Sequence, residues 1–161
     1  MEELGEENAK FMVKRNPSLI QKIIAAGFTI AAEDTEEKDE QDNTLEFALY
    51  LLYKYASEVP NPVAWPLFKA NIKSAWDSAN PLARRACLKV LGFVSESDAL
   101  LDCIKDDIDE LTELLVMALK DPDSGVRDAA ALTTAEFADN VVPDFLEMAD
   151  KILPCLLDVL T

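Results

Sequence analysis

Carboxylates are the side chains of this sequence best suited to chemistry, because its 161 residues include no histidine. One compact group is Asp106-Asp107 with Asp109-Glu110, and paired carboxylates can act as general acid and base. No histidine, nucleophile or phosphate-binding loop accompanies them, so nothing supports catalysis. The same acids suit the first turn of a helix, where they complement the helix dipole. We therefore expect a protein that is not an enzyme and that uses no cofactor.

The three cysteines are the remaining candidates for metal binding or for a disulfide. Cys87, Cys103 and Cys155 lie far apart among apolar neighbours and form no Cys-x-x-Cys pair. This spacing is typical of small core side chains in a reducing compartment. We expect neither a disulfide nor a metal site.

The net charge of −16, from 31 acidic and 15 basic residues, indicates which partners are possible. Such a field repels phosphate backbones and anionic lipid, and it attracts cationic proteins. We expect no nucleic acid and no membrane as a partner, although the charge would also serve simply to keep an apolar scaffold soluble. The longest apolar stretch, 23–32, is too short to span a bilayer, and the acidic first residues are unlike a signal peptide. The prediction is a soluble intracellular protein.

These side chains must be positioned by helices, because most of the chain has helical periodicity. The apolar residues of 111–119, for example, recur at three- and four-residue spacing, and prolines stand near most expected helix starts. The pattern predicts helices over 6–14, 17–32, 44–58, 62–77, 81–95, 103–120, 124–139 and 143–160. The two tryptophans, Trp65 and Trp76, fall in one of these helices and are expected to serve packing.

The predicted helices form pairs that repeat every 40 residues or so. A shift of about 43 residues places Arg127 on Arg84 and Ala129 on Ala86, and two helices in a period of about 40 residues are typical of HEAT repeats. One helix pair cannot bury its apolar face alone, so neighbouring pairs must stack. We expect an all-α fold, an α-α superhelix built as a HEAT-repeat solenoid. Its parts are a partial helix at 1–16, repeats at 17–60, 61–98 and 99–140, and the first helix of a further repeat at 141–161.

Local motifs resemble those of known HEAT proteins. The segment DPDSGVR at 121–127 resembles the HEAT signature, in which an aspartate ends the first helix and a Val-Arg opens the second. The resemblance implies a ladder of ion pairs between the aspartates and arginines of successive repeats. Asp77 and Arg84 occupy the same places one repeat earlier, whereas Thr44 and Leu45 interrupt the pattern before them.

The order of the pieces resembles the middle of a karyopherin-β. A proline-led helix ending at Ala32 is followed by an acidic run, by a helix ending YASE at 55–58, and by RRACLKVLG at 84–92. The likeness is greatest to the branch of importins that carries ribosomal proteins and histones. It implies a fragment of a nuclear transport receptor that binds basic nuclear-localisation segments of such cargo and carries them through the nuclear pore, between cytoplasm and nucleus. A HEAT scaffold of another class, such as a phosphatase regulatory or chromosome-organising subunit, stays open as the alternative.

The same resemblance implies further partners and an inner binding surface. Phe-Gly nucleoporins would dock between first helices on the convex side, and the GTPase Ran would bind elsewhere in the full-length receptor. Second helices would line the concave side, where aligned positions form columns of acids and aromatic rings, interrupted by Arg85 and Lys89. The expected cargo-binding residues are Glu46, Tyr50, Tyr53, Glu96, Asp128, Glu136 and Asp139. For each carboxylate the alternative is an ordinary solvated helix face.

The acidic loop at 33–42, inside the first repeat, is the second candidate site. Its acids are Glu33, Asp34, Glu36, Glu37, Asp39, Glu40 and Asp42. Blocks of like charge do not fold by themselves, so the loop is either a solvated spacer or a segment that attracts lysine-rich cargo or competes with it.

Overall fold

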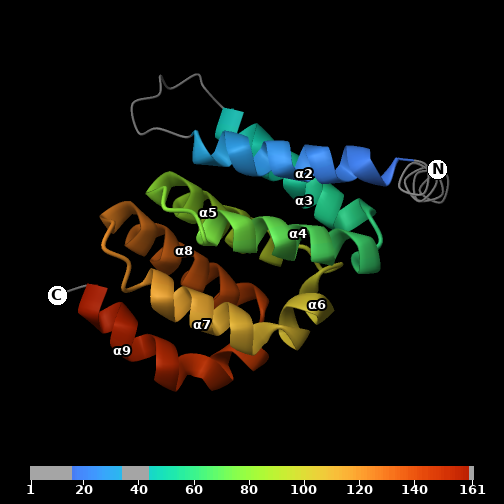
Figure 1. Ribbon diagram of the computed structural model, residues 1–161. Helices are drawn as coiled ribbons and strands as arrows, with labels where there is room; N and C mark the ends of the chain where they lie inside the picture. The colour runs from blue at the N-terminus through green and yellow to red at the C-terminus, as the bar shows by residue number, and fades with distance from the viewer. Residues whose placement is uncertain (1–15, 34–43, 160–161) are drawn as a thin grey trace.

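The computed structural model describes residues 16–33 and 44–159, and within these ranges every regular element is helical (Figure 1). The α-helices are α2 (Pro17–Ala32), α3 (Thr44–Glu58), α4 (Asn61–Trp76), α5 (Pro81–Ser95), α6 (Leu101–Asp106), α7 (Ile108–Ala118), α8 (Ser124–Asn140) and α9 (Ala149–Val159). A short 3-10 helix, η1 (Asp144–Met148), precedes α9. The predicted all-α class is confirmed. The expected helix over 6–14 lies outside the described residues.

The helices form two layers of consecutive pairs (Figure 1). First helices α2, α4 and α7 each pack against the second helix that follows them, which is α3, α5 and α8 respectively. The second helices in turn pack side by side, and α5 lies between α3 and α8. At the end of the row, α9 packs against α7 and η1. This arrangement is the stacked-pair architecture of a solenoid.

Two expected helices are divided in the structure. The helix expected over 103–120 begins at Leu101 and breaks at Asp107, which separates α6 from α7. The Asp107 carboxylate accepts a hydrogen bond from Trp65 Nε1 at 2.6 Å and pairs with Lys69 Nζ at 3.0 Å. These contacts from α4 stabilise the interruption at Asp107, and the periodicity of the local sequence does not predict them. The helix expected over 143–160 likewise starts as η1 and becomes α-helical only at Ala149.

Local side-chain caps account for where two of the second helices begin. Asn80 Oδ1 accepts a hydrogen bond from the Leu82 N–H at 3.0 Å, and Pro81 opens α5 with its φ angle already helical. Asp123 Oδ1 accepts from the Val126 N–H at 3.0 Å at the start of α8. Both caps satisfy amide groups that have no partner within their helix.

The core is continuous between the layers, and α5 is its centre. Leu88, Val90, Leu91 and Val94 of α5 are fully buried. Thr133 Oγ1 of α8 lies 2.9 Å from the Leu88 carbonyl oxygen, so this polar residue has a hydrogen-bond acceptor across the interface between repeats. Burial of such apolar side chains is the main force that holds one helix pair to the next.

The three cysteines are free thiols. Cys87 and Cys155 are buried and Cys103 is half-buried, so the first two are the predicted small core side chains. Burial raises the pKa of the Cys87 thiol to about 12, and the nearby Arg84 charge offsets only part of that effect. The Cys87 thiol therefore stays protonated at neutral pH.

An ion pair between Arg84 and Asp121 joins the second and third helix pairs. Arg84 Nε and Nη2 donate to the two carboxylate oxygens of Asp121 at 2.8 and 3.0 Å. The two side chains are only 15% and 7% exposed. Asp77, the equivalent aspartate one repeat earlier, instead forms an exposed pair with Lys73 at 3.3 Å. The bridge has the residues and the position that the HEAT-like signature implies.

Candidate binding surfaces

The residues expected to bind cargo lie on the three second helices. Glu46, Tyr50 and Tyr53 are on α3, Glu96 caps the C-terminus of α5, and Asp128, Glu136 and Asp139 are on α8. All are exposed except Tyr53 and Glu136, which are half-buried. We call the exposed surface of α3, α5 and α8 the second-helix face. Of the acidic loop, only Glu33 is described, at the C-cap of α2, and Asp34, Glu36, Glu37, Asp39, Glu40 and Asp42 lie outside the described residues.

Glu136 is half-buried because its carboxyl group packs over Gly92 of α5. A Cβ atom at Gly92 would collide with Glu136 Oε2 and would lie 2.8 Å from its Cδ. Burial raises the pKa of Glu136, and repulsion from Glu96 adds to the shift. Glu136 therefore differs from Glu96, Asp128 and Asp139, the exposed acids of the same face. Its proximity to Glu96 places two acids together where α5 meets α8.

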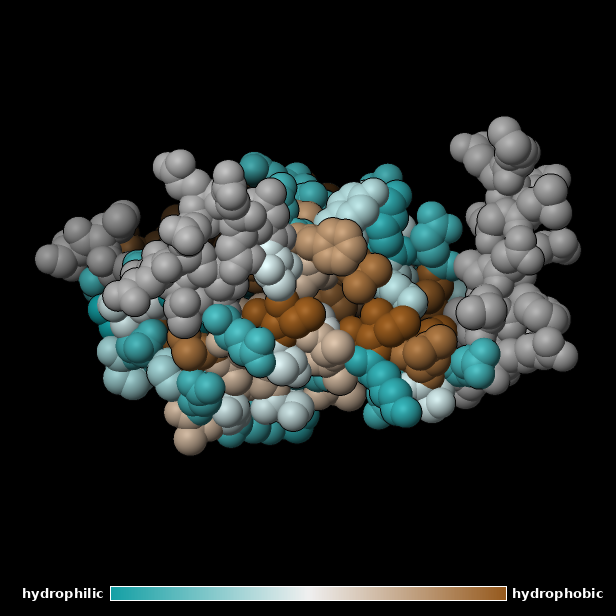
Figure 2. Space-filling model, turned by 90° about the horizontal axis from the view of Figure 1, so that it is seen from above, coloured by the Kyte–Doolittle hydropathy of each residue, from teal (hydrophilic) through white to brown (hydrophobic). Residues whose placement is uncertain are grey.

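A groove of about 350 Å³ opens on the second-helix face at α3 and α5, and we call it the aromatic groove. It is lined by Glu46, Phe47, Tyr50 and Phe93. Phe47 is 68% exposed and Tyr50 is 52% exposed. The view toward α2 and α3 shows apolar side chains gathered between hydrophilic ones (Figure 2). The arrangement presents aromatic rings to solvent beside a carboxylate.

Two further contacts fix the character of the aromatic groove. Phe93 packs edge-on against Tyr53, with ring centroids 6.0 Å apart. The Lys54 ammonium lies 5.7 Å from the centroid of the Tyr50 ring, within the range of a cation–π interaction. Phe47 was missed by the sequence reasoning. The exposure of Phe47 could have been inferred from the sequence, because Phe47 does not belong to the buried face of α3 that includes Ala48 and Leu52.

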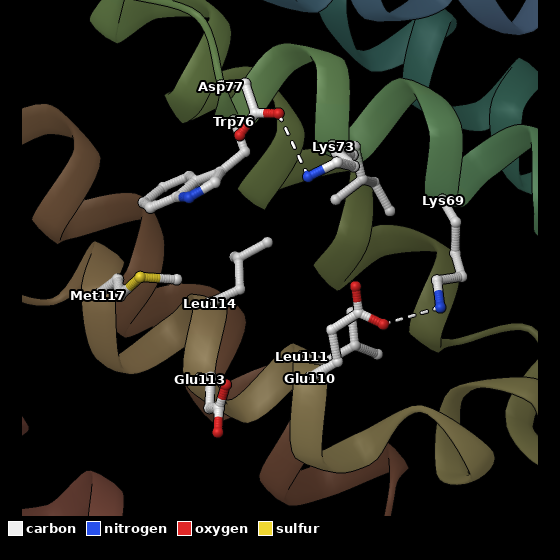
Figure 3. Close-up of a pocket in the computed structure, with 10 residues that line it drawn as sticks. Lys69, Lys73, Trp76, Asp77, Glu110, Leu111, Glu113, Leu114 and Met117 are labelled. Atoms are coloured by element: carbon white, nitrogen blue, oxygen red, sulfur yellow. Dashed lines mark hydrogen bonds and ion pairs between the residues drawn. The ribbon is translucent and has the colours of Figure 1, made fainter.

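A second groove, of about 340 Å³, lies between the first helices α4 and α7, and we call it the first-helix groove. Figure 3 shows Trp76 of α4 opposite Leu114 and Met117 of α7. Met117 is 53% exposed. Ion pairs stand along the rim, among them Lys69 Nζ to Glu110 Oε2 at 2.8 Å. Trp76, which was expected only to pack, forms one wall of an open apolar groove.

Other classes of site have little support in the part of the chain that the structure describes. There, no group of three or more histidine, cysteine or acidic side chains is arranged to hold a metal ion. None of the described helices is both long enough and apolar enough to cross a membrane. The two grooves and the carboxylates around them are therefore the candidate sites.

The stacked helix pairs, the two layers and the Arg84–Asp121 bridge define the class of the fold as a HEAT-repeat solenoid. The structure resembles that of Kap121p bound to Pho4p, with a TM-score of 0.79 at 19% identity over 93% of this chain and 16% of the other. It equally resembles the karyopherin Kap121p bound to the SUMO protease Ulp1p, with a TM-score of 0.80 at the same identity and coverage.

Sequence comparison finds similarity to importin-4, and no family model matches the chain. The sequence is 27% identical to human importin-4 over 146 residues, which is 84% of this chain and 13% of the relative. It is 26% identical to mouse importin-4 over 149 residues, which is 86% of this chain and 14% of the relative. The chain thus spans only a small part of the length of these proteins. The chain is thus similar in sequence to a short part of importin-4 and in fold to a short part of Kap121p.

Proposed function

We propose that the second-helix face binds basic segments of cargo proteins, as part of a receptor that carries them through the nuclear pore. The observation that carries the proposal is the set of exposed carboxylates on α3, α5 and α8, which lies beside exposed aromatic rings on a strongly acidic chain. Support also comes from the similarity to importin-4 and from the cargo-bound state of the Kap121p structures. Histones and ribosomal proteins are the cargo classes proposed, and the receptor would move between cytoplasm and nucleus.

The test is the binding of a fluorescent lysine-rich peptide to the chain, followed by anisotropy as salt is raised. Affinity should fall with salt, because screening weakens exposed charge pairs. Replacing the exposed acids Glu96, Asp128 and Asp139 together with serine should weaken binding about tenfold, since each exposed pair contributes at most about 1 kcal/mol. Glu136 is left unchanged because it is half-buried.

A matched variant separates a binding surface from a general charge effect. Asp102, Asp106 and Glu113 are exposed acids of α6 and α7, outside the second-helix face, and replacing them with serine removes the same charge. This control should lose less than about twofold in affinity. Equal losses in the two triple variants would reduce the carboxylates to a solubilising role. Salt-insensitive binding would favour a HEAT scaffold of another class.

We also propose that Phe-Gly nucleoporins dock in the first-helix groove, while Ran binds elsewhere in the full-length receptor. The groove lies between consecutive first helices, and Trp76, Leu114 and Met117 provide apolar walls for a phenyl ring. Met117→Glu should weaken the binding of a Phe-Gly peptide about tenfold, because a charge would enter an apolar groove. Leu132→Glu, a similarly exposed site on α8, is the control and should have little effect. Equal effects of the two variants would contradict the proposal.

A further inference from the structure

We propose that the aromatic groove is a binding site for methylated lysine side chains. This inference rests on the proposed function, because the methylated lysine would belong to a basic cargo segment lying on the second-helix face. It adds a preference that the surrounding carboxylates cannot provide. A carboxylate attracts any cation, whereas a group of aromatic rings favours one whose surface is apolar.

The walls of the groove have the composition that such a ligand requires. Phe47 and Tyr50 are three residues apart on α3, so their side chains are neighbours on the helix surface. Phe93 comes from α5 and forms another part of the lining. Glu46 supplies a carboxylate beside the three rings. Three aromatic rings and one acid are the residue types found in the aromatic cages that recognise quaternary ammonium groups.

Two contacts indicate that the groove is ready to receive a cation. The Phe93 ring is half-buried and is held edge-on against Tyr53 at an interplanar angle of 75°. A wall fixed in this way loses little conformational freedom on binding. The Tyr50 ring already has the Lys54 ammonium 5.7 Å from its centroid. The Tyr50 ring therefore accepts an ammonium group, and a ligand ammonium would take the place of the exposed Lys54 head group.

Methylation changes the lysine head group in a way that favours its contact with the aromatic walls of the groove. An unmodified ammonium is strongly hydrated and must give up water to enter a groove lined by rings. A trimethylated ammonium keeps its charge, cannot donate hydrogen bonds, and presents methyl groups that gain from contact with aromatic surface. Glu46 then complements the charge that remains. We expect the trimethylated form to bind about fivefold more tightly than the unmodified form.

The test uses the full chain and three versions of one peptide that differ only at a single lysine. This position carries unmodified lysine, trimethyllysine, or the uncharged analogue in which carbon replaces the ammonium nitrogen. Trimethyllysine should bind about fivefold more tightly than either of the others. Phe47→Ala and Tyr50→Ala should abolish the preference, while Tyr50→Phe should retain it. Glu46→Gln should weaken trimethyllysine more than the uncharged analogue.

Each result of these binding measurements either supports or overturns the inference. Phe47 and Tyr50 are largely exposed, so their substitution should leave the helical circular dichroism intact. Equal affinity for lysine and trimethyllysine would overturn the inference while leaving the proposed function in place. Equal affinity for trimethyllysine and its uncharged analogue would also overturn it, because the groove would then be merely apolar. N-acetyl-trimethyllysine amide, followed by chemical shifts of the Tyr50 ring, tests the groove even if the cargo proposal fails, and absence of any shift would again refute the inference.

Discussion

Arg84 and Asp121 show how two residues can connect neighbouring repeats. Burial by itself would raise the pKa of Asp121, but hydrogen bonds from Arg84 and from the Asp123 N–H outweigh it. Attraction to Arg84 and Arg127 acts in the same direction, so the pKa of Asp121 lies below its ordinary value of 3.8. Asp121 therefore remains ionised in the folded chain under conditions where a free aspartate is already partly protonated.

Removing one partner of this bridge should be costly. Arg84→Met leaves the Asp121 carboxylate buried without its bidentate partner, and we expect a loss of about 3 kcal/mol in the free energy of unfolding. Lys73→Met is the matched control, because Lys73 and Asp77 are 77% and 60% exposed, and it should cost about 0.5 kcal/mol or less. Urea unfolding followed by circular dichroism measures both. Similar losses in the two variants would show that the bridge contributes nothing beyond an ordinary surface pair.

The Arg84–Asp121 bridge also determines part of how the stability of the folded chain falls at acidic pH. The pKa of Asp121 is lower in the folded chain than in the unfolded chain. The contribution of its carboxylate to stability is therefore complete at pH values above the unfolded-state pKa, and it is lost as the pH falls through the folded-state pKa. The wild-type melting temperature should therefore drop more steeply below about pH 4 than that of Asp121→Asn, which has no carboxylate to protonate. Parallel acid profiles would contradict this account.

At the scale of helices, two glycines set how closely neighbouring elements approach. A Cβ at Gly27 of α2 would lie 2.7 to 2.9 Å from the Leu52 side chain, which is fully buried. Gly27→Ala should therefore destabilise the chain by about 1–2 kcal/mol. At Gly92 the obstacle is the Glu136 carboxyl group, which can rotate into solvent. Gly92→Ala should be neutral or stabilising by up to about 1 kcal/mol, because alanine favours helix.

Thermal unfolding of the two glycine variants distinguishes the cases. In Gly92→Ala the pKa of Glu136 should also return toward its ordinary value, since the carboxyl group loses its half-buried position. A titration by NMR would detect this change. If Gly92→Ala proved as damaging as Gly27→Ala, the Glu136 side chain would have to be fixed in place rather than free to rotate.

The helices themselves were largely predictable, while their contacts with one another were not. Periodicity and proline positions predicted α2, α3 and α5 with the bounds observed, because both signals are local. The break at Asp107 depends on Trp65 and Lys69 of another repeat, which periodicity does not report.

The same distinction holds for the candidate sites. Column alignment placed the acids on the second helices, but the half-buried state of Glu136 follows from its contact with Gly92. The aromatic groove likewise needs Phe93, which only packing brings to Phe47 and Tyr50. Local patterns indicated which residues are on a helix surface, and tertiary contacts decided which of them meet.

For the whole molecule, stability should decline from the middle of the row to its ends. Helix α5 has neighbours on both sides, whereas α9 packs against α7 and η1 and leaves Leu153 and Leu157 54% and 63% exposed. In a solenoid each pair is stabilised mainly by its neighbours. Amide hydrogen exchange should be at least about tenfold slower in α5 than in α9. Uniform exchange rates would instead indicate a single cooperative unit without weaker ends.

The buried thiol of Cys87 offers a way to measure how fast neighbouring helix pairs of the solenoid separate. Thiolates react with alkylating reagents and thiols do not, so a group with a pKa of about 12 inside the central helix is unreactive while the stack is closed. When neighbouring pairs separate, water reaches the sulfur, its acidity returns to normal, and modification follows. The rate at which Cys87 is alkylated therefore measures how often the helix pairs separate at the centre of the solenoid. The measurement uses a native side chain, so no reporter group has to be engineered into the chain.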